Sequence, residues 1–255
     1  MRARAAIRAE ADHHGRTRLV TMRSAPPLTL RRTGPSGSKE ATVHLVGSAA
    51  SPLGGDELQL TIELGPDTTL TLRTAAASVA LTGRDGESSL DVRAKLDAGA
   101  FLTYEPGPLI VTRGARHRIR ALIEMADEAR LRWREIIVLG RDNEPPGQLR
   151  MTTQADIGDL PLHRHELVIG DRPGWNGPAA LGGAKMYGTL LVAGDRQPHP
   201  VTASSARDDG VRWVRMPLEG PGMLATATDS RARPLDGVLD SIIAHGHPPT
   251  PRDPA

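Results

Sequence analysis

A recurrence of about 30 residues constrains this fold more than any other feature of the chain. In four segments, an apolar residue enters a short turn of small or acidic residues, and a strand with alternating apolar positions leaves it. They are LGPDTTLTL (64–72), LDAGAFLTY (96–104), MADEARLRW (125–133) and LEGPGMLAT (218–226). This spacing predicts stacked β-layers, because each layer needs its neighbours to cover its apolar face. Four ordinary hairpins would give the same pattern.

The stretch around the first of these turns carries the clearest local pattern. Apolar side chains occupy the even positions from Leu58 to Leu64, and polar side chains occupy the odd positions between them. Alternation with a period of two predicts a half-buried strand. Gly65-Pro66-Asp67 predicts a turn, because proline fixes φ and aspartate can bond its own backbone. The alternation resumes at 70 and 72, so we expect a loop followed by a strand hairpin, and then an alanine run, 75–77, that allows close packing of layers.

The rest of the chain is richer in turns than in helix. KMYGTLLVAGD (185–195) and GVRWVRMPLEG (210–220) are predicted strands, whereas 141–161 and 171–184 are predicted loops. One helix is predicted in RPLDGVLDSIIAHG (233–246), where apolar residues follow a helical spacing, with Pro234 in the first turn and Gly246 at the stop. The sequence therefore predicts a mainly β fold of stacked or coiled β-sheets, similar to a β-helix, with one or two α-helices.

Length and composition set the expected organisation. We expect a single domain over residues 1–255, with the first ~20 and the last ~8 residues flexible. The chain has no cysteine, which excludes disulfides and thiolate metal sites. It has no run of about 18 apolar residues, the length that a membrane helix needs. We therefore expect no membrane partner and a cytoplasmic location.

Basic residues gather in GARHRIRALIEMADEARLRWRE (114–135), yet the formal net charge is only +2. In this stretch the arginines alternate with apolar residues, as they do on a solvated strand face. That interpretation is favoured over a phosphate-binding surface. We therefore expect no nucleic-acid partner.

The search for chemistry gives few candidates. His163 and His165 share one face of a strand, which suits nickel or zinc, although such a pair on an arginine-rich turn is more often a polar edge. His245 and His247 end the predicted helix, where capping is the ordinary role. No nucleophile elbow, phosphate loop or zinc-protease motif occurs. We therefore name no catalytic residue.

Several segments, taken in order, resemble the UreD (UreH) family of urease accessory proteins. PLGGDELQLTIELGPDTTLTLRTAAAS (52–78) carries a Gly-Gly-Asp loop, a Gly-Pro turn and a small-residue segment; FLTYEPGPLIVTRGARHRI (101–119) carries Pro-X-Pro and Gly-Ala-Arg; and WREIIVLGRDNEPPGQL (133–149) carries a glutamate and then Gly-Arg. The likeness spans roughly residues 40–245. The matching motif residues are Gly54, Gly55, Ser78, Pro106, Pro108, Gly114, Arg116, Gly140 and Arg141.

Four positions depart from the family pattern and mark the chain as a divergent member. Ala75, Val79 and Leu81 stand where the family typically carries glutamine, lysine and an aromatic residue, and Gln148 replaces a glutamate. These departures bear on any ligand role of the small-residue segment more than on the fold.

The resemblance implies a scaffold and not an enzyme. Family members bind a UreF-like accessory protein, which recruits a UreG-like GTPase, and they dock on urease apoprotein to help insert nickel. The resemblance implies no tightly bound cofactor but allows transient binding of nickel(II). Candidate residues on a nickel path are Asp56, Glu105 and Glu135.

Two other classes of function remain open at this point. A β-rich ligand-binding module would use exposed aromatic residues, of which this chain has few. A metal-dependent hydrolase could use His163 and His165, but it needs a third ligand and an open coordination position.

Overall fold

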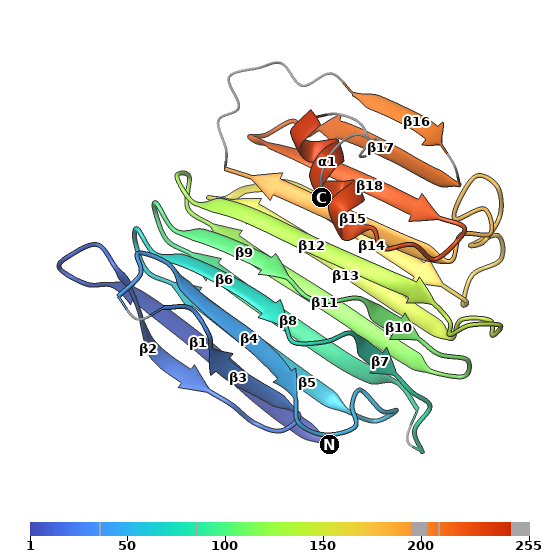
Figure 1. Cartoon of the computed structure of the whole chain (residues 1–255), viewed down its shortest axis with the longest axis horizontal. Helices are drawn as coiled ribbons and strands as arrows, with labels where there is room; N and C mark the ends of the chain where they lie inside the picture. The colour runs from blue at the N-terminus through green and yellow to red at the C-terminus, as the bar shows by residue number, and fades with distance from the viewer. Residues whose placement is uncertain (36, 85, 195–202, 209, 246–255) are drawn as a thin grey trace.

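Figure 1 presents a computed structural model of the chain, which describes residues 1–35, 37–84, 86–194, 203–208 and 210–245. Two sheets form its body. Sheet A has the order β14 (Leu160–Ile169), β13 (Gln148–Ile157), β11 (Arg116–Met125), β8 (Ser88–Leu96), β5 (Glu57–Leu64), β1 (Arg2–Ala11) and β2 (Thr17–Arg23).

Sheet B lies against sheet A and continues beyond it to the helix. Its order is β16 (Ser204–Asp208), β17 (Val211–Pro217), β18 (Gly222–Asp229), β15 (Met186–Ala193), β12 (Arg130–Leu139), β9 (Phe101–Glu105), β6 (Thr69–Thr74), β4 (Ala41–Gly47) and β3 (Leu28–Arg32). The short strand β10 (Leu109–Val111) pairs with both β12 and β7 (Ser78–Ala80).

The recurrence of about 30 residues corresponds to one turn of a coil. In each turn the chain forms a strand of one sheet and then a strand of the other. From β4 to β13 the long strands alternate between the two sheets, and neighbours within each sheet in this region are parallel. Leu64 lies opposite Leu96, and Leu96 lies opposite Met125. These residues open the first three recurring segments, so the prediction of stacked, coiled sheets is confirmed.

The fourth recurring segment is a hairpin. In 218–226 the amide of Leu218 donates to the carbonyl of Gly222, and β17 and β18 pair directly as antiparallel strands. The coil has ended by this point, so the same local plan of turn and strand gives ordinary antiparallel pairing.

The turn at 65–67 is a corner and not the predicted hairpin, because β5 belongs to sheet A and β6 to sheet B. Asp67 adopts a positive φ of 56°, and its amide donates to the carbonyl of Ala98 at 3.0 Å. The equivalent corner of the next coil therefore stacks on this one. Both strands of the stretch were predicted correctly, but their pairing was not, because the apolar sides of both strands are buried between the sheets.

The main core lies between the two sheets and consists of the inward-facing positions of the stacked strands. Tyr104 and Trp133 stack there with ring centroids 4.0 Å apart. Other fully buried members are Ile7, Leu60, Ile62, Leu70, Leu72, Leu96, Leu102 and Leu131.

The first ~20 residues are not the flexible arm that we expected. β1 pairs with β5 on one side and with β2 on the other, and Ala3, Ala5, Ile7 and Ala9 are buried. Their alternation with arginines is that of a strand, but small alanines give a weak apolar signal. The last eight residues lie outside the described part of the chain.

The predicted loop at 141–161 was also wrong over most of its length. It contains β13, whose inward positions Leu149, Met151, Thr153 and Ala155 are all buried. Threonine and alanine at two of these positions hid the alternation. The turn-rich character predicted for 171–184 is confirmed.

The predicted helix is α1 (Asp236–His245), which packs on the outer face of sheet B over β15 and β18 (Figure 1). Leu235, Leu239 and Ile242 are buried in a second apolar cluster there. Gly188 in β15 lets the helix approach, because a Cβ atom at this position would lie 3.0 Å from a methyl of Leu239. Gly246 and His247 lie outside the described residues. No described helix has the length and apolar character to cross a membrane.

The Gly-Gly-Asp loop sits where two backbones touch. A Cβ atom on Gly54 would lie 2.5 Å from the carbonyl oxygen of Gly86, and one on Gly83 would overlap the backbone of Gly54. Gly55 has a positive φ of 88°. Glycine is therefore required at 54 by close approach and is favoured at 55 by conformation.

This contact gives a test of stability. We expect Gly83→Ala to lower the free energy of unfolding by about 1–3 kcal/mol, because the new methyl group has no space. Gly47→Ala is the matched control: it has open space around its Cβ position and should change stability by less than about 0.5 kcal/mol. Urea unfolding of both variants measures the difference. Equal stabilities would contradict the backbone contact.

Candidate functional site

The three acids proposed for a nickel path lie in three separate places. Asp56 is in the loop before β5, Glu105 ends β9 on the outer face of sheet B, and Glu135 in β12 faces inward between the sheets. All three are buried. The structure does not bring them together.

Asp56 is surrounded by donors. Its carboxylate pairs with the N-terminal ammonium of Met1 and accepts hydrogen bonds from the Ser51 hydroxyl at 2.7 Å and the Leu53 amide at 2.9 Å. Burial alone would raise the pKa of Asp56, but the ammonium and these two donors outweigh it and hold the pKa below its ordinary value. These contacts give Asp56 a structural role at the start of the coil.

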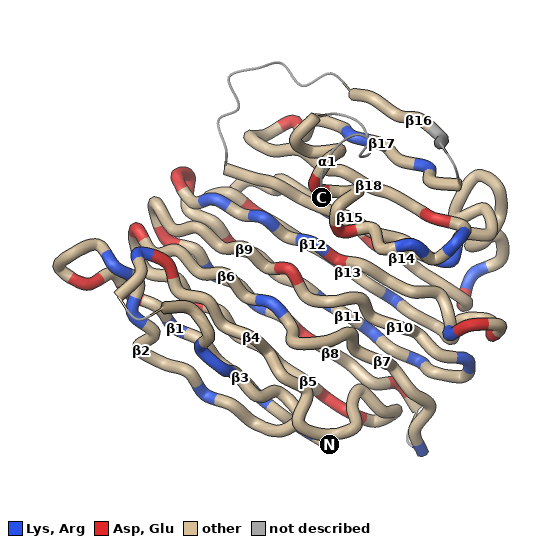
Figure 2. Tube along the Cα trace, in the orientation of Figure 1, with Lys and Arg blue, Asp and Glu red and all other residues tan. Residues whose placement is uncertain are grey.

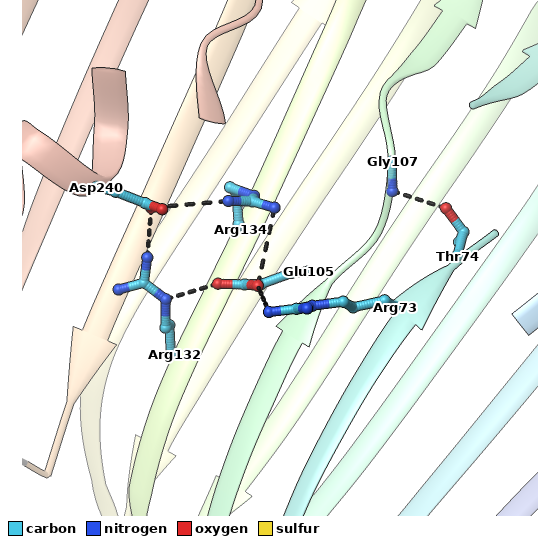
Figure 3. Close-up of polar contacts among 7 residues, drawn as sticks. All are labelled: Arg73, Thr74, Glu105, Gly107, Arg132, Arg134 and Asp240. Carbon is cyan, nitrogen blue, oxygen red and sulfur yellow. Dashed lines mark hydrogen bonds and ion pairs between the residues drawn. The ribbon is translucent and has the colours of Figure 1, made fainter. Parts of the chain in front are cut away.

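Glu105 is the centre of an ion network on the outer face of sheet B (Figure 3). It accepts from Nε of Arg132 at 2.7 Å and from Arg73 at 3.1 Å, and Arg134 lies 3.8 Å away. Burial alone would raise the pKa of Glu105, but Arg132, Arg134 and Arg73 outweigh it and hold the pKa below its ordinary value.

The same network holds the helix to the sheet. Asp240 of α1 accepts a hydrogen bond from Arg132 and lies 3.6 Å from Arg134. The pKa of Asp240 is nevertheless raised, because burial outweighs the two arginines. Arg132 and Arg134 lie on one side of β12, as the alternation of arginine with other residues in RLRWRE (130–135) indicates. The expectation of a solvated face was therefore wrong for this part of the stretch, because Asp240 of the predicted helix contacts both arginines.

Glu135 lies on the opposite face of the same strand. Its carboxylate accepts a hydrogen bond from the hydroxyl of Thr153 in β13, 2.9 Å away across the space between the sheets. Burial raises the pKa of Glu135, and the Thr153 hydrogen bond offsets this only in part. Burial, with a further contribution from the Glu135 charge, raises the pKa of the phenols of Tyr104 and Tyr187. Glu135 is thus a buried carboxylate in an apolar interior.

His163 and His165 share one face of β14, as predicted, but that face points into the molecule. Their strand is the last of sheet A, and the partners opposite them in β13 are the buried Ala155 and Thr153. Nε2 of His165 lies 3.2 Å from the hydroxyl of Tyr187 in sheet B. The turn location assumed from sequence was wrong, because 160–169 is a regular strand.

Burial shifts both histidines towards the neutral form. Burial lowers the pKa of His163 to about 4, with further lowering from His165 and Arg164, and burial also lowers the pKa of His165. Neutral imidazoles have the free lone pair that a metal needs. Among the described residues, no group of three or more His, Asp or Glu side chains is arranged to hold a metal ion.

A cavity of about 110 Å³ has Glu135 in its lining. Its polar lining includes Tyr104, Glu135 and His117, and its remaining walls are mostly aliphatic. His117 was missed in the sequence. It is buried on the inner face of β11, its Nδ1 lies 2.8 Å from the Ser88 hydroxyl, and burial lowers its pKa to about 4.

A surface groove of about 330 Å³ adjoins this cavity, and the two share Leu28, Leu45, Thr74 and Ser78 in their walls. The alanine run 75–77 lines the groove, with exposed side chains. The expectation that these alanines allow layers to pack closely was therefore wrong. The close approach comes instead from Gly107, where a Cβ atom would lie 3.0 Å from the carbonyl oxygen of Ala76.

The motif residues shared with the resembled family mostly shape corners of the coil. The amide of Ser78 donates to the carbonyl of Pro108, and the amide of Gly107, between Pro106 and Pro108, donates to the Thr74 hydroxyl (Figure 3). Both contacts join one coil to the next. The divergent residues Val79 and Leu81 line the groove beside Ala75.

The remaining motif residues lie in or beside the turns around β11 and after β12. Gly114 and Gly140 have positive φ values of 77° and 84°. Arg141 pairs with Glu144 at 3.0 Å within the second turn. Arg116 begins β11 with an exposed side chain, and Gln148 begins β13, where its amide donates to the carbonyl of Ala115.

Comparison with known proteins gives one consistent result. A family model described as UreD urease accessory protein matches residues 1–252. Urease accessory protein UreD of Parafrankia sp. is 42% identical over 265 residues, covering 95% of this chain and 88% of that protein. Urease accessory protein UreD 1 of Saccharopolyspora erythraea is 38% identical over 252 residues, covering 97% of this chain and 96% of that protein. The UreD of Streptomyces coelicolor is 35% identical over 247 residues, covering 96% of each.

The two buried glutamates of sheet B should give opposite pH profiles. The lowered pKa of Glu105 contributes stability that is present above the ordinary value of 4.5 and is lost as pH falls through the folded-state value. The raised pKa of Glu135 contributes stability that is present below 4.5 and is lost as pH rises through the folded-state value.

Urea unfolding between about pH 2 and pH 8 tests this, because the loss linked to Glu105 falls below its ordinary value of 4.5. Glu105→Gln should lower stability at neutral pH by roughly 1–3 kcal/mol and flatten the loss on acidification. Glu135→Gln should flatten the loss on alkalinisation instead. Profiles that change in the same direction in both variants would contradict the placement of the two carboxylates on opposite faces.

Proposed function

The chain belongs to the UreD family of urease accessory proteins, and from that membership we propose that it is a non-enzymatic scaffold for inserting nickel into urease. In this proposal it binds a UreF-like accessory protein, which recruits a UreG-like GTPase, and it docks on urease apoprotein. The complex depends on GTP, which the recruited partner hydrolyses. The match over nearly the whole chain supports the role in urease maturation.

The architecture suits a scaffold. Stacked parallel strands hold two broad sheets in fixed register, so the faces that a partner meets are set by the backbone and not by mobile loops. The relatives are named as accessory proteins. We therefore assign the chain a binding role and place the nucleotide chemistry on its partner.

One observation carries the nickel part of the proposal: Glu135 is a buried carboxylate between the sheets, with Thr153 as its hydrogen-bonding partner. The cavity reaches it from the side of Tyr104 and His117. His165 lies opposite Thr153 on the neighbouring strand. A route for nickel(II) would therefore meet Glu135 between two groups of polar residues.

The donor chemistry fits nickel as a passing cargo. Carboxylate oxygen and neutral imidazole nitrogen both suit a first-row divalent ion, whereas thiolates would hold it more tightly. The lowered pKa values of His163 and His165 keep their rings ready to bind without first losing a proton. Because burial raises the pKa of Glu135, a proton competes with nickel(II) for this carboxylate more than at an exposed glutamate, which favours loading at higher pH. Of the three candidate acids, we retain Glu135 on the path and place Asp56 and Glu105 outside it.

Glu135→Gln tests the interior route. Glutamine keeps the size of the side chain and can still accept from Thr153, so the fold and the pull-down of urease apoprotein should be retained. Nickel per urease active site after activation should fall at least about threefold, because the amide is a weaker ligand than the carboxylate. Metal analysis of the activated urease measures this.

Glu124→Gln is the matched control, since Glu124 is exposed on β11 of sheet A. It should leave nickel loading unchanged. Normal loading with Glu135→Gln in an intact complex would remove the interior route while leaving the scaffold role standing. If neither the wild type nor the variants pulled down urease apoprotein, the scaffold role itself would be contradicted.

The scaffold proposal also predicts what the purified chain does by itself. It should hydrolyse neither GTP nor urea, and GTP hydrolysis should begin only when the UreG-like GTPase is added. Phosphate release and ammonia release measure the two activities. Steady turnover of either substrate by the chain alone, retained through every purification step, would contradict the proposal.

A further inference from the structure

The β2 edge of sheet A is open. β2 pairs only with β1, and within the described residues no backbone hydrogen bond joins residues 18–23 to another segment. The register shift between Arg8 and Ala9, which leaves Val20 without a partner, lies on the opposite side of β2, where it faces β1. An unpaired edge presents a row of N–H and C=O groups to which another strand can add.

This edge also carries exposed apolar side chains. Val20 and Met22 are each 41% exposed. Most large apolar side chains in the described part of the chain are buried or half-buried, and the other large exposed ones are Met1 and Leu160. Two of these four residues therefore lie two positions apart on a single free strand.

Unpaired arginines surround the same edge. Arg4, Arg18, Arg23, Arg31 and Arg32 lie on β1, β2 and β3, all are exposed, and none forms an ion pair within the described residues. Figure 2 shows basic positions and no acidic one along β2 and β3. We call these five residues the basic rim.

The local acids do not neutralise the rim. Glu10 lies opposite Arg18 on β1, but its carboxylate pairs with Arg8 at 2.9 Å. Glu40 is the sole acidic residue between Asp12 and Asp56 in the sequence. The edge thus combines free backbone groups, apolar contacts and uncompensated positive charge.

A second copy of this chain is a poor occupant for the edge. Antiparallel pairing of β2 with β2, centred on Val20 and Thr21, would place Arg18 of one copy opposite Arg23 of the other. Like charges directly opposite each other on paired strands are destabilising. The charge that prevents this self-pairing favours a strand of opposite charge.

We propose that the β2 edge binds an acidic, extended segment of a partner protein, which adds to sheet A as a further strand. Backbone hydrogen bonds to β2 supply affinity, Val20 and Met22 contact apolar side chains of the segment, and the basic rim selects its carboxylates. This inference does not depend on the nickel path, because the edge is separate from Glu135.

The test uses the full chain and a seven-residue peptide that alternates glutamate with valine. The peptide should bind in low salt and should slow hydrogen exchange of the amides in residues 18–23. Arg18→Glu combined with Arg23→Glu should weaken binding at least about tenfold, because two attractions become repulsions. A peptide in which lysine replaces every glutamate should not bind.

Two controls separate strand addition from general attraction. Arg93→Glu combined with Arg120→Glu reverses two exposed, unpaired arginines on the central strands β8 and β11, which have no free edge. This variant should bind the acidic peptide within about twofold of the wild type. Equal weakening by both double variants, or no exchange protection in 18–23, would overturn the proposal and leave the rim as a guard against aggregation only.

Discussion

The structure depends on the parallel register that stacks one coil on the next. Because the chain changes sheet after each long strand of the coil, a strand such as β5 pairs with β8, and β6 pairs with β9, about 30 residues further along. Inward positions such as Leu60, Leu72 and Leu102 then meet in one continuous core. No single coil could bury this surface alone, so stacking and core formation are one event.

Neighbouring residues in a strand face opposite ways, so the position of a polar residue along its strand decides which surroundings it meets. Glu105 and Glu135 belong to adjacent strands of sheet B, yet one meets arginines beneath the helix and the other meets Thr153 between the sheets. Their pKa values shift in opposite directions for this reason. The surface network holds α1 in place, whereas the buried carboxylate marks the interior route that we propose for nickel.

A stacked fold must also end, and its two ends differ. At one end the antiparallel strands β15, β17 and β18, with helix α1, continue sheet B. At the other end β2 leaves a free edge, and exposed arginines lie on β2 and β3. A scaffold needs both a rigid body and surfaces to which partners can bind. In this chain the stacked strands form the body, and the exposed arginines of β2 and β3 lie at one end of it.

The sequence by itself determined the elements and their repeat. Alternation over 58–72 identified β5 and β6, the spacing of 64, 96 and 125 identified the coil, and helical spacing at Leu235, Leu239 and Ile242 identified α1. These signals are local, and each is carried by large apolar side chains. The alanines of β1 and the threonine of β13 bury equally well but carry little apolar signal, so both strands were missed.

Only the tertiary structure decided which face each strand buries and what each polar side chain meets. Local alternation fixes the parity of Glu135 relative to Trp133, but it does not identify the opposing strand that brings Thr153 within 2.9 Å. Arg132 and Asp240 are far apart in the sequence, and they meet because α1 folds back over sheet B. Such contacts depend on through-space packing between distant segments, and no local pattern encodes them.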